Sequence, residues 1–156
     1  MGLRQLGFLI YNFNPASTFM GDMGSMVLGF LLAVLAIKLD FKVPGDRQIV
    51  TWMVPVIVLG LPIFDTTLVV FTRLRERRSP MQGGKDHTSH RLVSLGLSQR
   101  VAVLVLYGVC VMLGLVAISL PDASIDSGLQ TGFALAVGAL GAFVFLEYVY
   151  IRSKQH

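Results

Sequence analysis

The chain has 156 residues, of which 54% are hydrophobic and 14% are charged, and its formal net charge is +4. Soluble domains carry about 25% charged residues, so this composition excludes an ordinary soluble domain and indicates an integral membrane protein. The basic residues flank apolar stretches, which points to membrane topology rather than to nucleic-acid binding.

The first informative segment is a glycine-flanked turn before an apolar run. Asp22 lies between Gly21 and Gly24, and Ser25 is the expected N-cap of the following helix. Glycines permit a tight turn that leaves the carboxylate open to a ligand, which suits a magnesium-phosphate site. The alternative is that Asp22 only complements the helix dipole.

Apolar stretches at four places approach or exceed the length of about 20 residues that crosses a bilayer. The expected spans are residues 23–39, 49–71, 101–120 and 127–151. Lys and Arg are concentrated in the loop of residues 72–100 and are absent from residues 121–130. By the positive-inside rule, this loop and both termini face the cytoplasm. The predicted fold is therefore an all-α polytopic membrane protein, with residues 1–156 in a single membrane domain.

The second expected span contains an acidic residue. Pro62 should kink this helix and free backbone carbonyls close to Asp65. An acidic residue inside a span is costly, so it indicates a functional site. The structural alternative is an ion pair with Arg73, which lies two helical turns further along. The predicted topology places Asp22, Asp65 and the basic loop at one membrane face, which favours an active site over a scaffold.

The densest polar cluster lies in the cytoplasmic loop. His87 and His90 are three residues apart, with Lys85 and Arg91 beside them. Together these donors could form a cradle for phosphate oxygens. A zinc site is not supported, since no third His or Cys lies close in the sequence and Cys110 falls within an expected span. The alternative is a solvated cytoplasmic loop.

The last expected span carries small residues at every fourth position, namely Ala134, Gly138 and Ala142. Small residues let helix backbones approach closely, so this face is expected to pack against another helix. The pattern bears on packing and not on substrate.

These motifs resemble the polyprenyl-phosphate N-acetylhexosamine-1-phosphate transferase family, also called glycosyltransferase family 4. The segments that carry the resemblance are Asn14-Pro15-Ala16, Phe19 to Ser25 with Leu28-Gly29, Pro62 to Thr66 with Arg73, and Ser79-Pro80 with Asp86 to Leu92. Their order and spacing agree with the family over nearly the whole chain. The histidine loop departs from the triple-His pattern of the phospho-MurNAc-pentapeptide transferases, and it fits the bacterial undecaprenyl-phosphate GlcNAc-1-phosphate transferases better.

The resemblance implies transfer of a HexNAc-1-phosphate, expected to be GlcNAc-1-phosphate, from a UDP-sugar to polyprenyl (undecaprenyl) phosphate. The products would be a polyprenyl-diphosphate-sugar and UMP, in the biosynthesis of cell wall, lipopolysaccharide or teichoic acid. The resemblance also implies Mg²⁺ as the metal, with Mn²⁺ as an alternative, and a multi-pass protein of the bacterial cytoplasmic membrane with a cytoplasmic active face. The expected partners are UDP-N-acetylhexosamine, the lipid and the membrane, without nucleic acid; a homodimer is left open.

The same resemblance assigns roles to individual residues. It implies that Asp22 is catalytic and binds the metal, and that Asp65 is catalytic in a role that stays open. The residues implied to bind substrate are Asn14, Lys85, His87, His90 and Arg91. Family members are longer and have more spans, so this chain is expected to be the C-terminal portion of such an enzyme and to be inactive alone.

Alternatives to this enzyme remain open at this stage. One is a non-catalytic membrane module, either a pseudoenzyme or a subunit that completes another chain. Another is an enzyme of the phospho-MurNAc-pentapeptide transferase type. A small transporter would use Asp65 in its pathway but would not explain the Asp22 turn or the histidine loop.

Overall fold

The structure is a computed structural model that describes residues 2–13, 16–38, 48–81, 84 and 86–153. Across this part of the chain the secondary structure is helical and no strand occurs, which confirms the predicted all-α class. The chain divides into two compact units, Met1–Asp40 and Phe41–His156.

The first unit contains helices α1 (Gly2–Asn12) and α2 (Gly21–Lys38). Helix α2 starts at Gly21, whose φ of 69° is a left-handed conformation that glycine adopts without strain. The prediction that Ser25 caps this helix is therefore wrong, because Ser25 lies within its first turns and donates to the carbonyl of Asp22 at 2.9 Å. The glycine conformation, and not a serine cap, sets the start of α2.

The second expected span is interrupted. It consists of α3 (Gln48–Val58) and α4 (Gly60–Arg75), which are separated at Leu59. Proline has no backbone N–H, so Pro62 cannot donate to the carbonyl of Val58, four residues earlier. The helix breaks at that carbonyl, which confirms the interruption predicted from Pro62 and starts α4 five residues before Asp65.

Helices α6 (Gln99–Ser119) and α7 (Ile125–Ser153) are long and apolar enough to cross a membrane. The short 3₁₀ helix η1 (Leu120–Asp122) connects them. These two helices match the third and fourth expected spans; no other helix of the described residues meets the same length and hydropathy requirement. The four-span topology as a whole stays a prediction.

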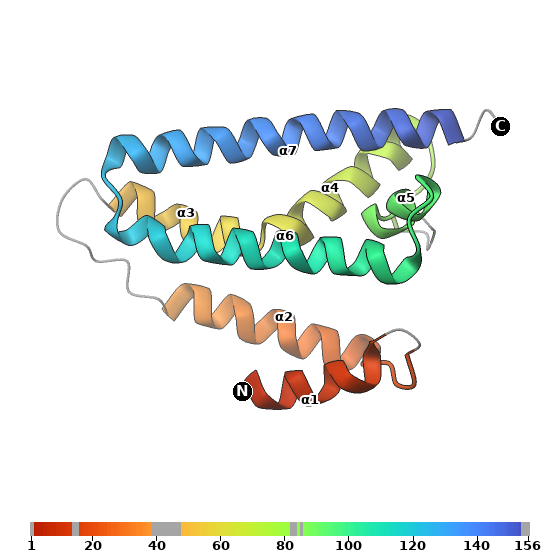
Figure 1. Cartoon of the computed structure of the whole chain (residues 1–156), viewed down its shortest axis with the longest axis horizontal. Coiled ribbons are helices and arrows are strands. Elements are labelled where there is room, and N and C mark those ends of the chain that lie inside the picture. The colour runs from red at the N-terminus through yellow and green to blue at the C-terminus, as the bar shows by residue number, and fades with distance from the viewer. Residues whose placement is uncertain (1, 14–15, 39–47, 82–83, 85, 154–156) are drawn as a thin grey trace. The chain divides into compact units, whose positions relative to one another are not determined.

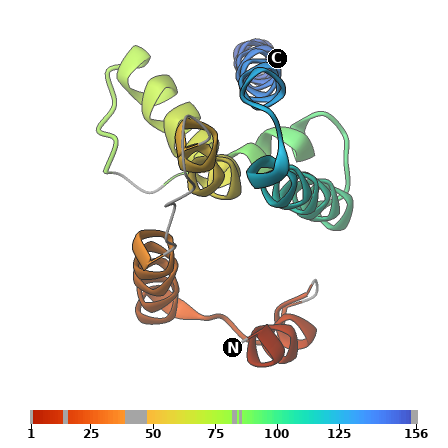
Figure 2. The same ribbon diagram turned by 90° about the vertical axis from the view of Figure 1, so that its left-hand side faces the viewer.

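In the second unit, α3 contacts both α6 and α7, and α4 also contacts both (Figures 1 and 2). A small core of Ile57, Ala117 and Leu120 holds α3 to the end of α6 and to η1. Phe143 of α7 packs edge-on against two rings of α4, at centroid distances of 6.2 Å for Phe64 and 5.2 Å for Phe71. These contacts fix α4, and with it Asp65, against α7.

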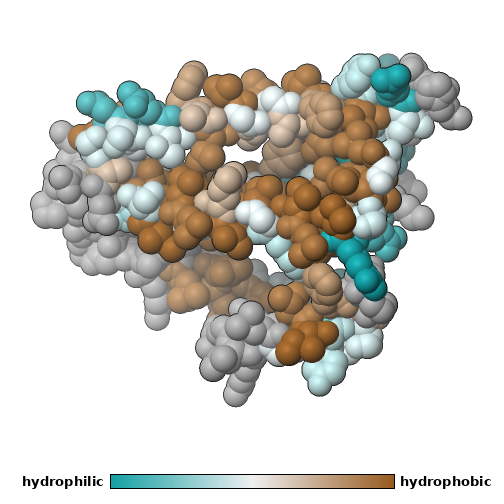
Figure 3. All heavy atoms as spheres, in the orientation of Figure 1, coloured by the Kyte–Doolittle hydropathy of each residue, from teal (hydrophilic) through white to brown (hydrophobic). Residues whose placement is uncertain are grey.

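The outer surfaces of α6 and α7 are mainly apolar, with hydrophilic groups gathered toward the two ends of α7 (Figure 3). Large exposed apolar side chains along a whole helix are unfavourable in water and suit a lipid environment. The small residues Ala134, Gly138 and Ala142 are also exposed, so no described helix of the second unit covers the expected packing face. The close helix contact on α7 lies instead at Gly132, where an added Cβ would clash with Met53 of α3.

Helix α5 (Thr88–Ser94) is a short helix inside the expected cytoplasmic loop. It ends before Gly96, whose φ of 94° reverses the chain toward α6. Helix α5 contacts both α6 and α7, beside the C-terminal end of α7 (Figure 1). The fold therefore places the histidines of the loop next to the polar end of the bundle.

Candidate active site

The structure brings Asp65 of α4 into contact with the start of α5, 22 residues further along the chain. One carboxylate oxygen, Oδ2, lies 2.8 Å from Nδ1 of His87. The other, Oδ1, accepts the backbone N–H of Thr88 at 2.6 Å. Both carboxylate oxygens therefore hold the histidine loop, and the alternative of an ion pair between Asp65 and Arg73 is wrong because Arg73 turns to Asp86.

The pair between Asp65 and His87 fixes the orientation of the imidazole ring. A carboxylate only accepts hydrogen bonds, so the proton of this contact belongs on Nδ1 of His87. The second ring nitrogen, Nε2, is then left for another partner, and the His87 side chain is 50% exposed. Such a ring can donate Nε2–H to an anion when it is protonated or accept a proton when it is neutral.

A cleft of about 270 Å³ lies beside His87. Apolar side chains of α4 and of the turn that follows form most of its walls, and a few polar side chains lie between them. The lining residues are Thr66, Val69, Val70, Arg73, Pro80, Met81, Gly84 and His87. This is the place in the described structure where a ligand could meet both His87 and a cationic side chain.

An ion-pair cluster around Asp86 closes the loop next to this cleft. Asp86 accepts from Nε of Arg73 at 3.0 Å and from Nη2 of Arg78 at 3.2 Å, and the hydroxyl of Tyr150 lies 3.3 Å away. Burial alone would raise the pKa of Asp86, but the hydrogen bonds and charges of Arg78 and Arg73 outweigh it and hold the pKa below 3.8. The same contact raises the pKa of Arg78. Gly84 packs against this ion pair: an added Cβ would lie 2.8 Å from Oδ2 of Asp86 and 2.9 Å from Nη2 of Arg73, so a larger residue would have to displace these side-chain ends.

Comparison with known proteins bears on this arrangement. Residues 1–40 match the family described as Glycosyl transferase family 4. Over 132 residues, 85% of this chain, the sequence is 39% identical to the "Probable undecaprenyl-phosphate N-acetylglucosaminyl 1-phosphate transferase" of Bacillus subtilis (strain 168). Over 147 residues, 89% of this chain, it is 33% identical to the "Decaprenyl-phosphate N-acetylglucosaminephosphotransferase" of Mycolicibacterium smegmatis. The chain is related to glycosyl transferase family 4, as its motifs predicted.

The extent of these matches differs between relatives. The chain spans 36% of the length of both the Bacillus and the Mycolicibacterium proteins. A "Phospho-N-acetylmuramoyl-pentapeptide-transferase" of Staphylococcus carnosus is 55% identical, but over only 38 residues, or 24% of this chain. No solved structure gives a significant match. The similarity that covers most of the chain is therefore to proteins named for N-acetylglucosamine phosphate transfer.

Arg91, which the family resemblance assigns to substrate binding, is 2% exposed. Its nitrogens donate to protein oxygens: Nε to the carbonyl of Asp86, Nη1 to Glu147 and the carbonyl of Leu146, and Nη2 to Thr72. The contacts that the structure gives Arg91 are thus structural, and its role in substrate binding stays a prediction. His90, in contrast, is exposed on α5.

The other predicted site residues are distributed elsewhere. Asn14 and Lys85 lie outside the described residues. Asp22 is exposed in the first turn of α2, within the first compact unit. Its predicted convergence with Asp65 and the histidine loop stays a prediction.

The metal site expected of glycosyl transferase family 4 is only partly matched by the described side chains. Among them, no three His, Cys, Asp or Glu side chains cluster in a way that could hold a metal ion. Asp65 and Asp86 already bind His87, Thr88 and two arginines, whereas Asp22 presents an exposed carboxylate. Mg²⁺ commonly takes one or two carboxylates together with water and substrate phosphates, so Asp22 fits a single oxygen ligand.

Four residues of the site region were missed by sequence reasoning, namely Thr72, Asp86, Glu147 and Tyr150. Glu147 carried a usable signal, because it is an acidic residue inside the last expected span, the same feature that singled out Asp65. For Thr72 and Tyr150 the sequence holds no such signal, since their roles arise from contacts with residues 19 or more positions away.

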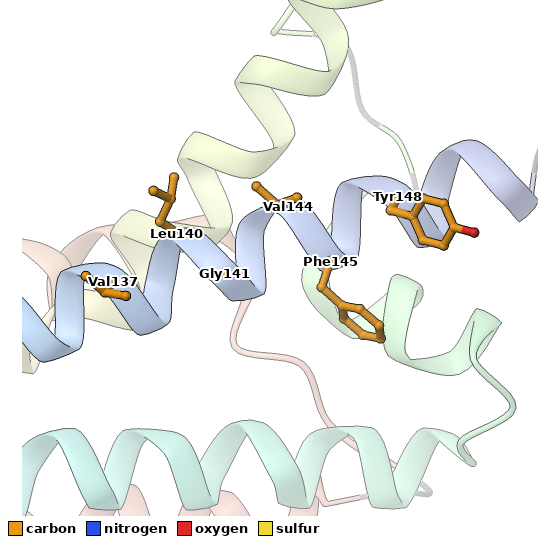
Figure 4. Close-up of a pocket in the computed structure, with 6 residues that line it drawn as sticks. All are labelled: Val137, Leu140, Gly141, Val144, Phe145 and Tyr148. Carbon is orange, nitrogen blue, oxygen red and sulfur yellow. The ribbon is translucent and has the colours of Figure 1, made fainter.

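A larger apolar hollow of about 650 Å³ lies along α7 and is separate from these residues (Figure 4). The side chains that line it are Val137, Leu140, Gly141, Val144, Phe145 and Tyr148. They include none of the predicted site residues, and apart from the Tyr148 hydroxyl they offer no group for acid–base or phosphate chemistry. The cleft beside His87 is therefore the better candidate for the active site.

Proposed function

We propose that this chain contributes the Asp65–His87 part of the active site of a membrane transferase that moves GlcNAc-1-phosphate from UDP-GlcNAc to a polyprenyl phosphate. In that reaction a lipid phosphate oxygen bonds to the β-phosphorus of the UDP-sugar. The bond from this phosphorus to the bridging oxygen breaks, and UMP leaves. The observation that carries the proposal is the contact of Asp65 with His87 beside a cleft, in a chain related to glycosyl transferase family 4.

In this proposal His87 binds the diphosphate. Asp65 accepts the Nδ1 proton, so that in the protonated ring Nε2–H can donate to a phosphate oxygen. The exposed His90, on the helix that follows His87, offers a second donor. Hydrogen bonds to charged groups contribute about 1.5–3 kcal/mol each. A donor held in position before substrate arrives is more effective than a mobile one, because little reorganisation accompanies binding.

The metal belongs to the proposal as well. Asp22 would be a carboxylate ligand of Mg²⁺, or of Mn²⁺ in its place, and the bound ion would neutralise charge on the diphosphate. The proposed location is the bacterial cytoplasmic membrane, with the histidine loop on the cytoplasmic side.

The relationship to the Bacillus subtilis protein provides the test. Because this chain matches about a third of that protein, a chimera can be made in which the chain replaces the matching segment. The chimera and the intact Bacillus protein are purified in lipid nanodiscs and assayed for UMP release from UDP-GlcNAc with undecaprenyl phosphate. We expect both to release UMP, and we expect the chimera to lose most of this activity when His87 or Asp65 is replaced.

A matched control variant is Thr67→Val, because Thr67 is an exposed residue of α4 whose hydroxyl bonds only within its own helix, to the carbonyl of Ile63. This variant should keep the activity of the chimera. A chimera that inserts and folds but releases no UMP, beside an active Bacillus parent, would refute the proposal and favour a non-catalytic membrane module. Turnover of UDP-MurNAc-pentapeptide in preference to UDP-GlcNAc would assign the chain to the other branch of the family.

A further inference from the structure

Helix α5, which begins directly after His87 and contains His90, is joined to α7 by a buried ion pair. Nη1 of Arg91 lies 2.7 Å from Oε2 of Glu147, and the two side chains are 1% and 9% exposed. Arg91 also lies over the ring of Tyr150, with its guanidinium carbon 4.5 Å from the ring centroid. A buried charged contact therefore contributes to anchoring the loop to α7.

The remaining donors of Arg91 connect this anchor to the candidate site. Its Nε donates at 3.0 Å to the carbonyl of Asp86, the residue directly before His87. Its Nη2 donates at 2.6 Å to the hydroxyl of Thr72 on α4, the helix that also carries Asp65. One guanidinium thus holds α4, α7 and the backbone next to His87 in a single arrangement.

We infer that Glu147 is a positioning residue: it holds Arg91, and through the Asp86 carbonyl it keeps His87 in register with Asp65. The consequence for turnover rests on the proposed transferase function, but the positioning itself can be measured without it. The planar guanidinium, with five N–H donors, can serve three segments at once, whereas a lysine ammonium cannot reproduce that geometry.

The buried ion pair between Arg91 and Glu147 should make the loop sensitive to substitution of Glu147. A buried ion pair adds little net stability compared with apolar packing, but removal of one partner leaves an uncompensated buried charge. Loss of the Glu147 charge should therefore loosen Arg91, which keeps only the Leu146 carbonyl and the Tyr150 ring on α7, and should weaken its hold on the Asp86 carbonyl. Glu147 also pairs through Oε1 with Arg75 at 2.9 Å, but Arg75 belongs to α4 and is 36% exposed.

The test uses hydrogen–deuterium exchange on the 156-residue chain in nanodiscs. The reporter is the backbone amide of Thr88, which donates to Asp65. We expect Glu147→Gln to speed exchange of this amide by about tenfold or more, with unchanged helix content by circular dichroism. The matched control is Arg75→Gln, which removes the other partner of Glu147 and should leave the Thr88 amide close to the parent rate.

A second pair of variants covers the case in which Glu147→Gln fails to fold. Thr72→Val removes the hydroxyl that is bonded to Arg91 and nearly conserves the side-chain volume. Arg91→Lys keeps the positive charge but loses the planar guanidinium and its several N–H donors. Both variants should speed exchange of the Thr88 amide. An unchanged Thr88 rate in these variants, or equal acceleration in Arg75→Gln, would overturn the inference.

A kinetic measurement separates this inference from the proposed function. In the chimera with the Bacillus relative, Glu147→Gln should lower kcat more than it changes KM for UDP-GlcNAc, because a misplaced His87 still leaves other substrate contacts. If the unsubstituted chimera is inactive, the proposed function fails while the exchange result still decides whether Glu147 positions the loop.

Discussion

Asp86 accepts a hydrogen bond from Nε of Arg73 at 3.0 Å, although the two residues are 13 positions apart and belong to the two sides of the turn that follows α4. Nη1 of Arg73 also donates to the carbonyl of Pro80 at 2.9 Å. The end of α4 thus organises the loop that presents His87, and the loop conformation depends on a carboxylate that was not among the predicted site residues.

Low pH should weaken the contacts of Asp86 with Arg73 and Arg78. Because the folded-state pKa of Asp86 is depressed, its contribution to stability is fully present above the unfolded value and is lost as the pH falls through the folded value, below 3.8. We expect Asp86→Asn to lower the melting temperature at neutral pH and to flatten the pH dependence of melting below about pH 4. Melting curves of both proteins in detergent from pH 2 to 7 measure this. The exposed Asp126, replaced in the same way, should change melting less; an identical pH dependence in Asp86→Asn and the parent would contradict the prediction.

Replacement of Asp65 by Asn should weaken the contact with His87 while it preserves the size of the side chain. The amide keeps the side-chain volume but loses the charge and one acceptor oxygen. If its oxygen accepts the N–H of Thr88, its NH₂ faces Nδ1 of His87 and cannot stabilise a protonated imidazole. In the chimera with the Bacillus relative we expect kcat to fall by about tenfold or more, since a hydrogen bond to a charged group contributes about 1.5–3 kcal/mol. Kinetics near the parent level would reduce Asp65 to a structural residue.

Replacement of the exposed histidines should lower the use of UDP-GlcNAc without lowering the stability of the fold. His87→Ala and His90→Ala each remove a donor from a half-exposed or exposed position, so the melting temperature should stay near that of the parent chain. Catalytic efficiency with UDP-GlcNAc should fall roughly 10- to 150-fold for each lost contact. UMP release by the chimera across UDP-GlcNAc concentrations, measured beside a melting curve for each variant, provides the comparison. A loss of stability large enough to explain the lost activity would assign these residues to structure.

Asp22 offers a test of the metal. In the chimera, Asp22→Asn should lower turnover and raise the Mg²⁺ concentration required for half-maximal activity, because an amide oxygen is a weaker ligand for Mg²⁺ than a carboxylate. Binding of Mn²⁺, followed by electron paramagnetic resonance without substrate turnover, should weaken in the same variant. If activity and Mn²⁺ binding both equal those of the parent, Asp22 serves only the dipole of α2.

The sequence predicted those features that depend on local chemistry. The missing N–H of Pro62 placed the interruption of the second span, and the cost of an acidic residue in an apolar segment singled out Asp65. The histidine loop stood out by composition, and the structure places His87 on Asp65. The long apolar runs predicted the bounds of α6 and α7 to within two residues.

Other features depend on tertiary contacts that no local pattern contains. The partners of Arg91 come from α4, α7 and its own loop, so its burial could not be read from a basic cluster. The start of α2 was misplaced because a glycine in a left-handed conformation ended the preceding turn before any serine could cap the helix. The small-residue face of α7 stays a prediction, because among the described helices of the second unit it is α3 that meets α7, at Gly132.

The length of α7 links the site to the thickness of the lipid bilayer. Its 29 residues extend about 43 Å at 1.5 Å per residue, whereas the hydrocarbon core measures about 30 Å. About nine residues must therefore project beyond the hydrocarbon or be accommodated by tilt, and Glu147 lies six residues before the end of the helix. In lipids with longer acyl chains the Arg91–Glu147 pair would be drawn toward the hydrocarbon, so membrane composition becomes a variable that acts on the geometry of the histidine loop.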